Sequence, residues 1–320
     1  MKSHDHEVRH LSDLDRRAFI KRSAAFTGLL AISSLVETPT FAASNSAKLA
    51  GFSAFSKTVK VTKSGKYYLV ESSGIPSHPM MVGIKSWQQQ IPTVQPYTGS
   101  NAWSIPIKPV VSKNPMSAKA DFLKGAIALA VNGVPIFNAL NNRGDDALLS
   151  GELDDWGGHC GRADDYHYHV APLHLQAIVG KKVPIAYALD GFPIYGETEI
   201  DGKVVTGLDS FNGHFDVKKN YHYHGTKTFP YINGGFRGVV SQVDGQVDPQ
   251  ARTRPFRPAG DPLQGAVITG CNQSAANTFD LTYSLAGADY HVKYTATLSK
   301  VEVTFINPDG TSRNESYLRA

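Results

Sequence analysis

A 17-residue segment occurs twice in this chain, and the repeat constrains the fold more than any other feature. "LDDWGGHCGRADDYHYH" (153–169) and "LDSFNGHFDVKKNYHYH" (208–224) align without a gap at an offset of 55 residues and are identical at eight positions. Upstream of them, "VNGVPIFN" (131–138) resembles "LDGFPIYG" (189–196). The repeat predicts a core built from two copies of one strand-rich unit.

Each copy carries the pattern His-x7-His-x-His. In a strand, residues i and i+2 point to the same face, so the two histidines of each Tyr-His-Tyr-His can converge on one ion. The upstream histidine, expected in the preceding loop, completes three nitrogen ligands, which suits zinc or copper. The intervening tyrosines are expected to pack on the core from the opposite face. The predicted ligands are His159, His167 and His169 in one copy and His214, His222 and His224 in the other, with His78 as an additional candidate.

Four aspartates are candidates for a general base or for acceptors that orient the ligand imidazoles. They are Asp154, Asp165, Asp190 and Asp209. Asp154 and Asp209 recur in both copies, which favours them over the others, while a turn role is the alternative for Asp165 and Asp190. The sequence contains no serine nucleophile elbow, phosphate loop or dinucleotide fingerprint. An enzyme of this sequence would therefore use the metal, with an aspartate as base.

The first 42 residues have the organisation of an export signal. Arg16 and Arg17 are followed by Phe19 and Lys21, and then by an apolar run over residues 23–36. This segment resembles a twin-arginine signal, with a general secretory signal as the alternative. The resemblance implies export of the folded protein, often with a cofactor already loaded. A periplasmic or secreted protein is the expectation.

The two cysteines, Cys160 and Cys271, fit that compartment as a disulfide. The alternative is that Cys160, which follows His159, is a metal ligand. The sequence favours the disulfide.

The composition is that of a globular protein, with 41% hydrophobic and 19% charged residues. No stretch approaches the roughly 20 apolar residues of a membrane span, so none is expected in the mature chain. The net charge is +4 and the basic residues are dispersed, which gives nucleic-acid binding little support. Histidine is common (12) and methionine scarce (4), which argues against a soft Cu(I) store.

Short runs rich in β-branched and aromatic residues alternate with glycine and proline along the mature chain. They predict a mainly β fold with a sandwich-like or barrel-like core, long irregular loops and an internal duplication; α+β is the alternative. The predicted parts are a signal peptide (1–42), a leader (43–57), a single β domain (58–310) with its internal repeat (131–169 and 189–224), and a tail (311–320).

Several segments together resemble a known family. "GHCGRADDYHYHVAP" (158–172) and "YALDGFPIYG" (187–196) resemble the YHYH family, exported proteins named for this tetrapeptide. "ESSGIPSHP" (71–79) and "GAIALAVNGVPIFN" (125–138) are similar to its upstream pattern. By this resemblance, residues 166–169 are the defining motif, and His78, His159 and residues 188–196 match its surroundings. The resemblance implies no particular reaction.

The sequence therefore favours an exported metal-binding or metal-delivery protein that holds zinc or copper, and a metalloenzyme stays open beside it. A surface module that binds a glycan, peptide or other small molecule through its tyrosines and histidines, without metal, is the alternative. Each copy can hold its own ion, or the two histidine pairs can face each other around one ion.

Overall fold

Strands dominate the computed structural model, which describes residues 47–319. The predicted signal peptide and the first residues of the predicted leader lie outside the described residues. Within them, the strands form five open sheets and no closed barrel, which confirms the mainly β prediction. No helix in this part of the chain is long and apolar enough to cross a membrane. The helices are single turns: α1 (Ala118–Asp121), α2 (Gln176–Val179), and the 3-10 turns Phe52–Phe55, Gly99–Asn101 and Leu173–Leu175.

The repeat forms one eight-stranded sheet with the strand order β7-β8-β6-β5-β9-β10-β12-β11. The first copy supplies β5 (Ala126–Ala130), β6 (Pro135–Phe137), β7 (Gly158–Cys160) and β8 (Tyr166–Tyr168). The second copy supplies β9 (Ala186–Ala188), β10 (Pro193–Tyr195), β11 (Gly213–Phe215) and β12 (Tyr221–His224). The order reads the same from both edges, so the two copies are related by a pseudo-two-fold axis.

That axis passes between β5 and β9, which pair antiparallel at the centre of the sheet. Leu129 pairs with Tyr187. On either side of this pair, Ala128 pairs with Ala188 and Ala130 with Ala186. All five β5 residues are buried, and small alanine side chains leave room for layers on both faces. The arrangement confirms the internal duplication. It also places the two Tyr-His-Tyr-His strands in opposite halves of the sheet.

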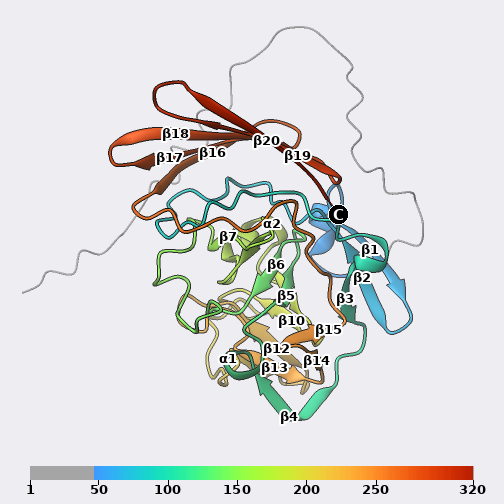
Figure 1. The fold of residues 1–320 in the computed structure, drawn as a ribbon. Helices are drawn as coiled ribbons and strands as arrows, with labels where there is room; N and C mark the ends of the chain where they lie inside the picture. The colour runs from blue at the N-terminus through green and yellow to red at the C-terminus, as the bar shows by residue number, and fades with distance from the viewer. Residues whose placement is uncertain (1–46, 320) are drawn as a thin grey trace, which may run out of the picture. The chain divides into compact units, whose positions relative to one another are not determined.

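The remaining strands form four smaller sheets. β4 pairs with β13 antiparallel, β14 and β15 form a hairpin, and the C-terminal five strands form an antiparallel meander, shown from orange to red in Figure 1. The bounds are β1 (Lys60–Ser64), β2 (Tyr67–Glu71) and β3 (Trp103–Pro106); β4 (Val111–Ser117) and β13 (Gly235–Gly238); β14 (Ser241–Val243) and β15 (Gln246–Asp248); β16 (Val267–Ala275), β17 (Thr278–Leu285), β18 (Ala288–Ala296), β19 (Lys300–Ile306) and β20 (Ser312–Leu318).

The segment between β2 and β3 runs between the meander and the first repeat copy (Figure 1). Its backbone bonds to both neighbours: Gly83 N–H donates to the Ile268 carbonyl of β16 (2.9 Å), and Thr93 N–H donates to the Asp164 carbonyl (2.9 Å). Asp164 also forms a buried ion pair with Arg257 (2.8 Å). This irregular segment thus fixes the meander to the repeat.

The segment predicted as a tail contains β20, whose residues Ser312 to Leu318 pair in register with β19. Five of these seven residues are exposed and most are polar, because β20 is an edge strand whose surroundings are solvent. An edge strand of this composition lacks the apolar alternation that identifies a strand from sequence.

The predicted disulfide is absent from the structure, in which Cys160 and Cys271 are free and buried thiols. Both belong to the hydrophobic core. Burial raises the pKa of the Cys160 thiol well above its ordinary value and that of Cys271 to about 12. Since the thiolate is the reactive form, this environment disfavours oxidation to a disulfide.

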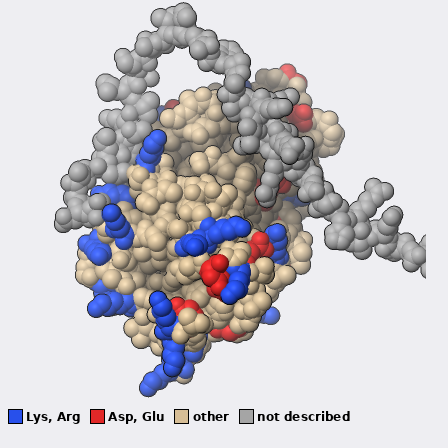
Figure 2. Space-filling model, turned by 180° about the vertical axis from the view of Figure 1, so that it is seen from behind, with Lys and Arg blue, Asp and Glu red and all other residues tan. Residues whose placement is uncertain are grey.

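On one face of the molecule, the cationic side chains lie in small groups. Figure 2 shows one face on which lysine and arginine lie in several separate groups, with acidic side chains between some of them. Some lysine side chains form ion pairs with acidic side chains, as in Lys203–Asp201 (2.8 Å) and Lys60–Glu71 (3.7 Å). On this face the basic residues form no single cluster.

The glycine of each Gly-His pair is required by the tyrosine that faces it. A Cβ atom at Gly158 would lie 2.5 Å from the Tyr166 hydroxyl oxygen, and one at Gly213 would overlap the Tyr221 hydroxyl. We expect Gly158→Ala and Gly213→Ala each to lower the free energy of unfolding by about 1–3 kcal/mol, measured by urea denaturation. Gly270→Ala is the control, because its nearest neighbour atom is 3.6 Å away. Equal midpoints for Gly158→Ala and the control would contradict this account.

Candidate metal centres

Three histidines of the first copy converge on one point. β7 and β8 form an antiparallel hairpin in which His159 lies directly opposite His167, and His169 follows two residues later. The His169 Nε2 atom is 3.0 Å from His159 Nε2 and 3.1 Å from His167 Nε2. Two nitrogens bound to one ion at ~2.0–2.1 Å lie roughly 2.9–3.4 Å apart at bond angles of about 90–110°. The cluster is therefore able to hold a metal ion.

The second copy repeats this arrangement and adds a carboxylate. His214 lies opposite His222 in the hairpin of β11 and β12, with their Nε2 atoms 3.1 Å apart. Glu199 Oε1 is 3.0 Å from His214 Nε2, and its Oε2 is 3.6 Å from His222 and 3.8 Å from His224. This cluster offers four ligand atoms to one ion.

In both copies the first histidine comes from a strand, where the sequence placed it in a loop. The seven-residue spacing is the length of a hairpin that returns the chain to the same level of the sheet. Cross-strand neighbours have Cβ atoms roughly 4.5–5.5 Å apart, which suits two imidazoles that share an ion. The spacing His-x7-His-x-His is thus explained by hairpin geometry.

Backbone carbonyls decide which ring nitrogen faces the cluster. A carbonyl oxygen can only accept a hydrogen bond, so the Nδ1 atom that contacts it carries the ring proton and Nε2 keeps its lone pair. The Nδ1 donors and their acceptors are His167 to Asp165 (2.9 Å), His169 to Asn138 (2.5 Å) and His224 to Gly196 (2.7 Å). His159 and His222 also hydrogen-bond backbone carbonyls, those of Glu152 and Asn220. Such second partners are typical of metal-binding histidines.

In the first copy the Nε2 lone pairs of His167 and His169 face each other at 3.1 Å, an arrangement that a cation between them would stabilise. Burial lowers the pKa of His169 to about 3 and that of His224 to about 4, so a proton does not fill this role at neutral pH. The His224 Nε2 atom is buried and has no hydrogen-bond partner. Imidazole nitrogen, with or without carboxylate oxygen, is a donor set that zinc and copper accept. The residues present therefore fit a transition-metal ion.

The repeated aspartates hold the hairpins and do not contact the ligand rings. Asp154 Oδ2 accepts a hydrogen bond from the Tyr166 hydroxyl (2.8 Å), and Asp209 Oδ2 accepts one from Tyr221 (2.8 Å). The other oxygen of each accepts N–H groups of the turn that precedes β7 or β11. The two aspartates therefore recur because each one fixes the hydroxyl of the first tyrosine in its Tyr-His-Tyr-His segment.

The remaining two predicted aspartates differ from each other. Asp165 lies beside a ligand: its carbonyl accepts the His167 Nδ1–H, and its carboxylate Oδ2 is 3.5 Å from the same nitrogen. Asp190 instead accepts the Tyr223 hydroxyl (2.6 Å), and burial raises its pKa to about 6. Of the four candidates, Asp165 is the one placed to orient a ligand imidazole.

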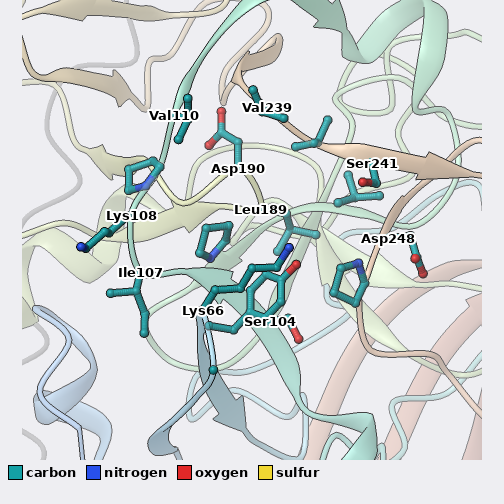
Figure 3. Close-up of a pocket in the computed structure, with 17 residues that line it drawn as sticks. Lys66, Ser104, Ile107, Lys108, Val110, Leu189, Asp190, Val239, Ser241 and Asp248 are labelled. Carbon is teal, nitrogen blue, oxygen red and sulfur yellow. The ribbon is translucent and has the colours of Figure 1, made fainter.

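Asp190 also lines a cavity of about 500 Å³. Figure 3 shows Asp190 between Val110 and Val239, with Lys66, Ser104 and Asp248 among the other residues that line the cavity. None of the six clustered histidines lines this cavity. Asp190 links the cavity to β12, because it accepts the hydroxyl of Tyr223, which lies between His222 and His224.

His78 is not brought to either cluster. Its Nδ1 donates to the Pro79 carbonyl (2.7 Å), and its Nε2 accepts the Tyr168 hydroxyl hydrogen (2.6 Å). The ring stacks on Trp156 with centroids 4.8 Å apart. His78 therefore supports the tyrosine face of β8 and contributes no ligand to the histidine face.

Glu199 is the ligand that the sequence analysis missed. It lies in the loop after β10, 15 residues before His214, and the first copy has asparagine at the equivalent position, Asn141. Comparison of the two copies therefore gives no signal for it. The tertiary fold alone brings this loop over the hairpin.

Comparison with known proteins gives one match. A family model described as YHYH protein matches residues 102–204, so this part of the chain is a YHYH family domain. The match includes His159, His167, His169 and Glu199 and ends before His214. No curated protein and no solved structure matches the chain.

The lowered histidine pKa values predict a pH dependence of the metal-free protein. In the unfolded chain these rings take up a proton near pH 6.5, whereas in the folded state they do so only near pH 3 to 4. The free energy of unfolding should therefore fall as pH falls from about 6.5 to about 4, by up to ~1.4 kcal/mol per pH unit for each such histidine. Urea denaturation in chelator at pH 7 and pH 5 measures it. Replacement of His224 by Gln should make the dependence shallower, and equal stability at both pH values would contradict the assignment.

Proposed function

We propose that this chain is an exported protein that binds two transition-metal ions, one in each repeat copy. The observation that carries the proposal is the convergence of three histidines in each copy, with Nε2 atoms 3.0–3.1 Å apart. Backbone carbonyls hold the Nδ1 protons of His167, His169 and His224 outward. A cation between the converging nitrogens would stabilise this arrangement. Since the clusters lie in opposite halves of the sheet, the two sets do not share one ion.

Zinc or copper fits these donors best. Sulfur donors are absent from both clusters, and the neighbouring Cys160 has its thiol held neutral by burial. When bound, such a metal supplies a Lewis acid or, for copper, a redox centre. The chain's own residues orient the imidazoles and keep the first site apolar, with Phe137 stacked on His167 at 3.8 Å between centroids. Metal binding, metal delivery and metal-dependent catalysis all start from this arrangement.

The glycan or peptide alternative has less support, because its aromatic contacts are not accessible. Tyr166, Tyr168, Tyr221 and Tyr223 are each at most 2% exposed. Their hydroxyls are bound by Asp154, Asp209 and other internal groups. A ligand cannot stack on these rings without unfolding the hairpins.

Elemental analysis of the purified protein tests the metal sites. We expect two zinc or copper ions per chain in the wild-type protein, because each copy holds a complete donor set. The double variant His167→Ala/His169→Ala should lose one ion, and His222→Ala/His224→Ala should lose the other.

The matched control is His291→Ala, a histidine on β18 outside both clusters. It should keep two ions per chain. A wild-type protein that is metal-free and takes up neither zinc nor copper at pH 7.5 would overturn the proposal. Loss of both ions in each double variant would contradict independent sites.

Export is supported by the N-terminal sequence alone. A twin-arginine signal depends on its arginine pair, so Arg16→Lys/Arg17→Lys should keep the protein in the cytoplasm. Cell fractionation and immunoblotting measure this, with Lys21→Arg as a charge-preserving control. Unchanged export of the double variant would point to the general secretory route.

A further inference from the structure

We infer that the two sites have different coordination: the first keeps one position free for a small anionic ligand, and Glu199 closes the second. The inference rests on the proposed metal binding and adds to it a ligand site. It comes from comparison of the two copies, which differ at one decisive position.

The loop that follows β6 and the loop that follows β10 have the same backbone structure. Asn141 N–H donates to the Asp145 carbonyl and Glu199 N–H to the Lys203 carbonyl, both at 2.8 Å. Each loop contains a glycine with positive φ three residues later, and each is closed by an isolated bridge, Leu140 with Asp146 and Thr198 with Val204. Asn141 and Glu199 are therefore structural equivalents.

Their side chains nevertheless point to different partners. Glu199 reaches all three histidines of its cluster, with His214 nearest at 3.0 Å. The Asn141 oxygen accepts the N–H groups of Arg143 (2.9 Å) and Asp145 (3.0 Å) in its own loop. Its amide nitrogen donates to the Glu152 carboxylate (3.1 Å). The first site thus has no ligand from this loop.

Neither carboxylate beside the first site reaches its Nε2 atoms. Asp165 Oδ2 is 3.5 Å from His167 Nδ1, the nitrogen that faces away from the cluster. The Glu152 carboxylate has other partners. Glu152 is buried, and its carboxylate binds the Arg143 guanidinium as well as the Asn141 amide. The hydrogen bond to Glu152 raises the pKa of Arg143, so the guanidinium stays charged beside this carboxylate. His159 contacts Glu152 through its backbone carbonyl and not through the side chain. Glu152 is accordingly not among the atoms that converge with the three histidines.

The two donor sets have different consequences for an exogenous ligand. Four protein ligands are typical of closed metal sites, and three leave one position open. A divalent ion with three neutral imidazoles keeps a net charge of +2, whereas Glu199 reduces it to +1 in the second site. A small anion is therefore the ligand class that the first site favours.

Cobalt(II) and azide provide the test, because the visible spectrum of bound cobalt reports its coordination. His222→Ala/His224→Ala isolates the first site, and His167→Ala/His169→Ala isolates the second. We load both variants with cobalt and titrate them with azide. The azide concentration that changes the spectrum should be at least about tenfold lower for the variant that keeps the first site than for the variant that keeps the second. Equal azide affinities of the two sites would overturn the inference.

Exchange of the distinguishing residue should exchange the behaviour. In the background with only the second site, Glu199→Gln should gain a spectral response to azide, and Glu197→Gln in the same loop is the matched control. In the background with only the first site, Asn141→Glu should weaken azide binding by about tenfold or more. Circular dichroism checks that the Asn141→Glu variant is folded. If Glu199→Gln gains no azide binding, that result alone contradicts the inference. Failure of cobalt to bind at either site would instead overturn the proposed function.

Discussion

Hydrogen bonds from imidazole Nδ1 atoms to backbone carbonyls are the interaction on which both centres depend. Without them each ring could turn, and two neighbouring histidines would satisfy each other as donor and acceptor. With Nδ1 fixed on the carbonyls of Asn138 and Gly196, the Nε2 atoms of His169 and His224 must face the cluster. These two carbonyls belong to equivalent positions after β6 and β10, so the constraint was duplicated together with the strands.

The pseudo-two-fold sheet explains why the duplication gives two sites and not one. β5 and β9 meet at the centre, and the His-bearing hairpins form the outer edges of the sheet. The tyrosine face of each hairpin is anchored internally, by Asp154 on Tyr166 and by Asp209 on Tyr221. In both copies, one face of the Tyr-His strand is therefore structural and the other carries the candidate metal ligands.

The copies have diverged around this common frame. Asn132 contacts the Tyr168 hydroxyl (3.0 Å), while the equivalent Asp190 contacts Tyr223 and opens onto a large cavity. At the equivalent positions Asn141 and Glu199, the first copy again has an amide side chain and the second copy an acidic one. In the second copy a carboxylate, Glu199, lies at the Nε2 atoms of the histidines, whereas in the first copy the Asp165 carboxylate lies on the Nδ1 side of His167. This asymmetry is the basis of the different coordination proposed for the two sites.

By itself, the sequence determined the mainly β fold, the duplication and the six clustering histidines, because strand alternation and repeat spacing are local properties of the chain. It did not determine Glu199, since the loop that brings this carboxylate over β11 and β12 is positioned by long-range contacts. It also suggested a disulfide that the structure lacks and metal-orienting roles for Asp154 and Asp209 that belong to the tyrosine face. Only the tertiary structure decided these points, because they depend on which groups meet across the sheet and on how deeply they are buried.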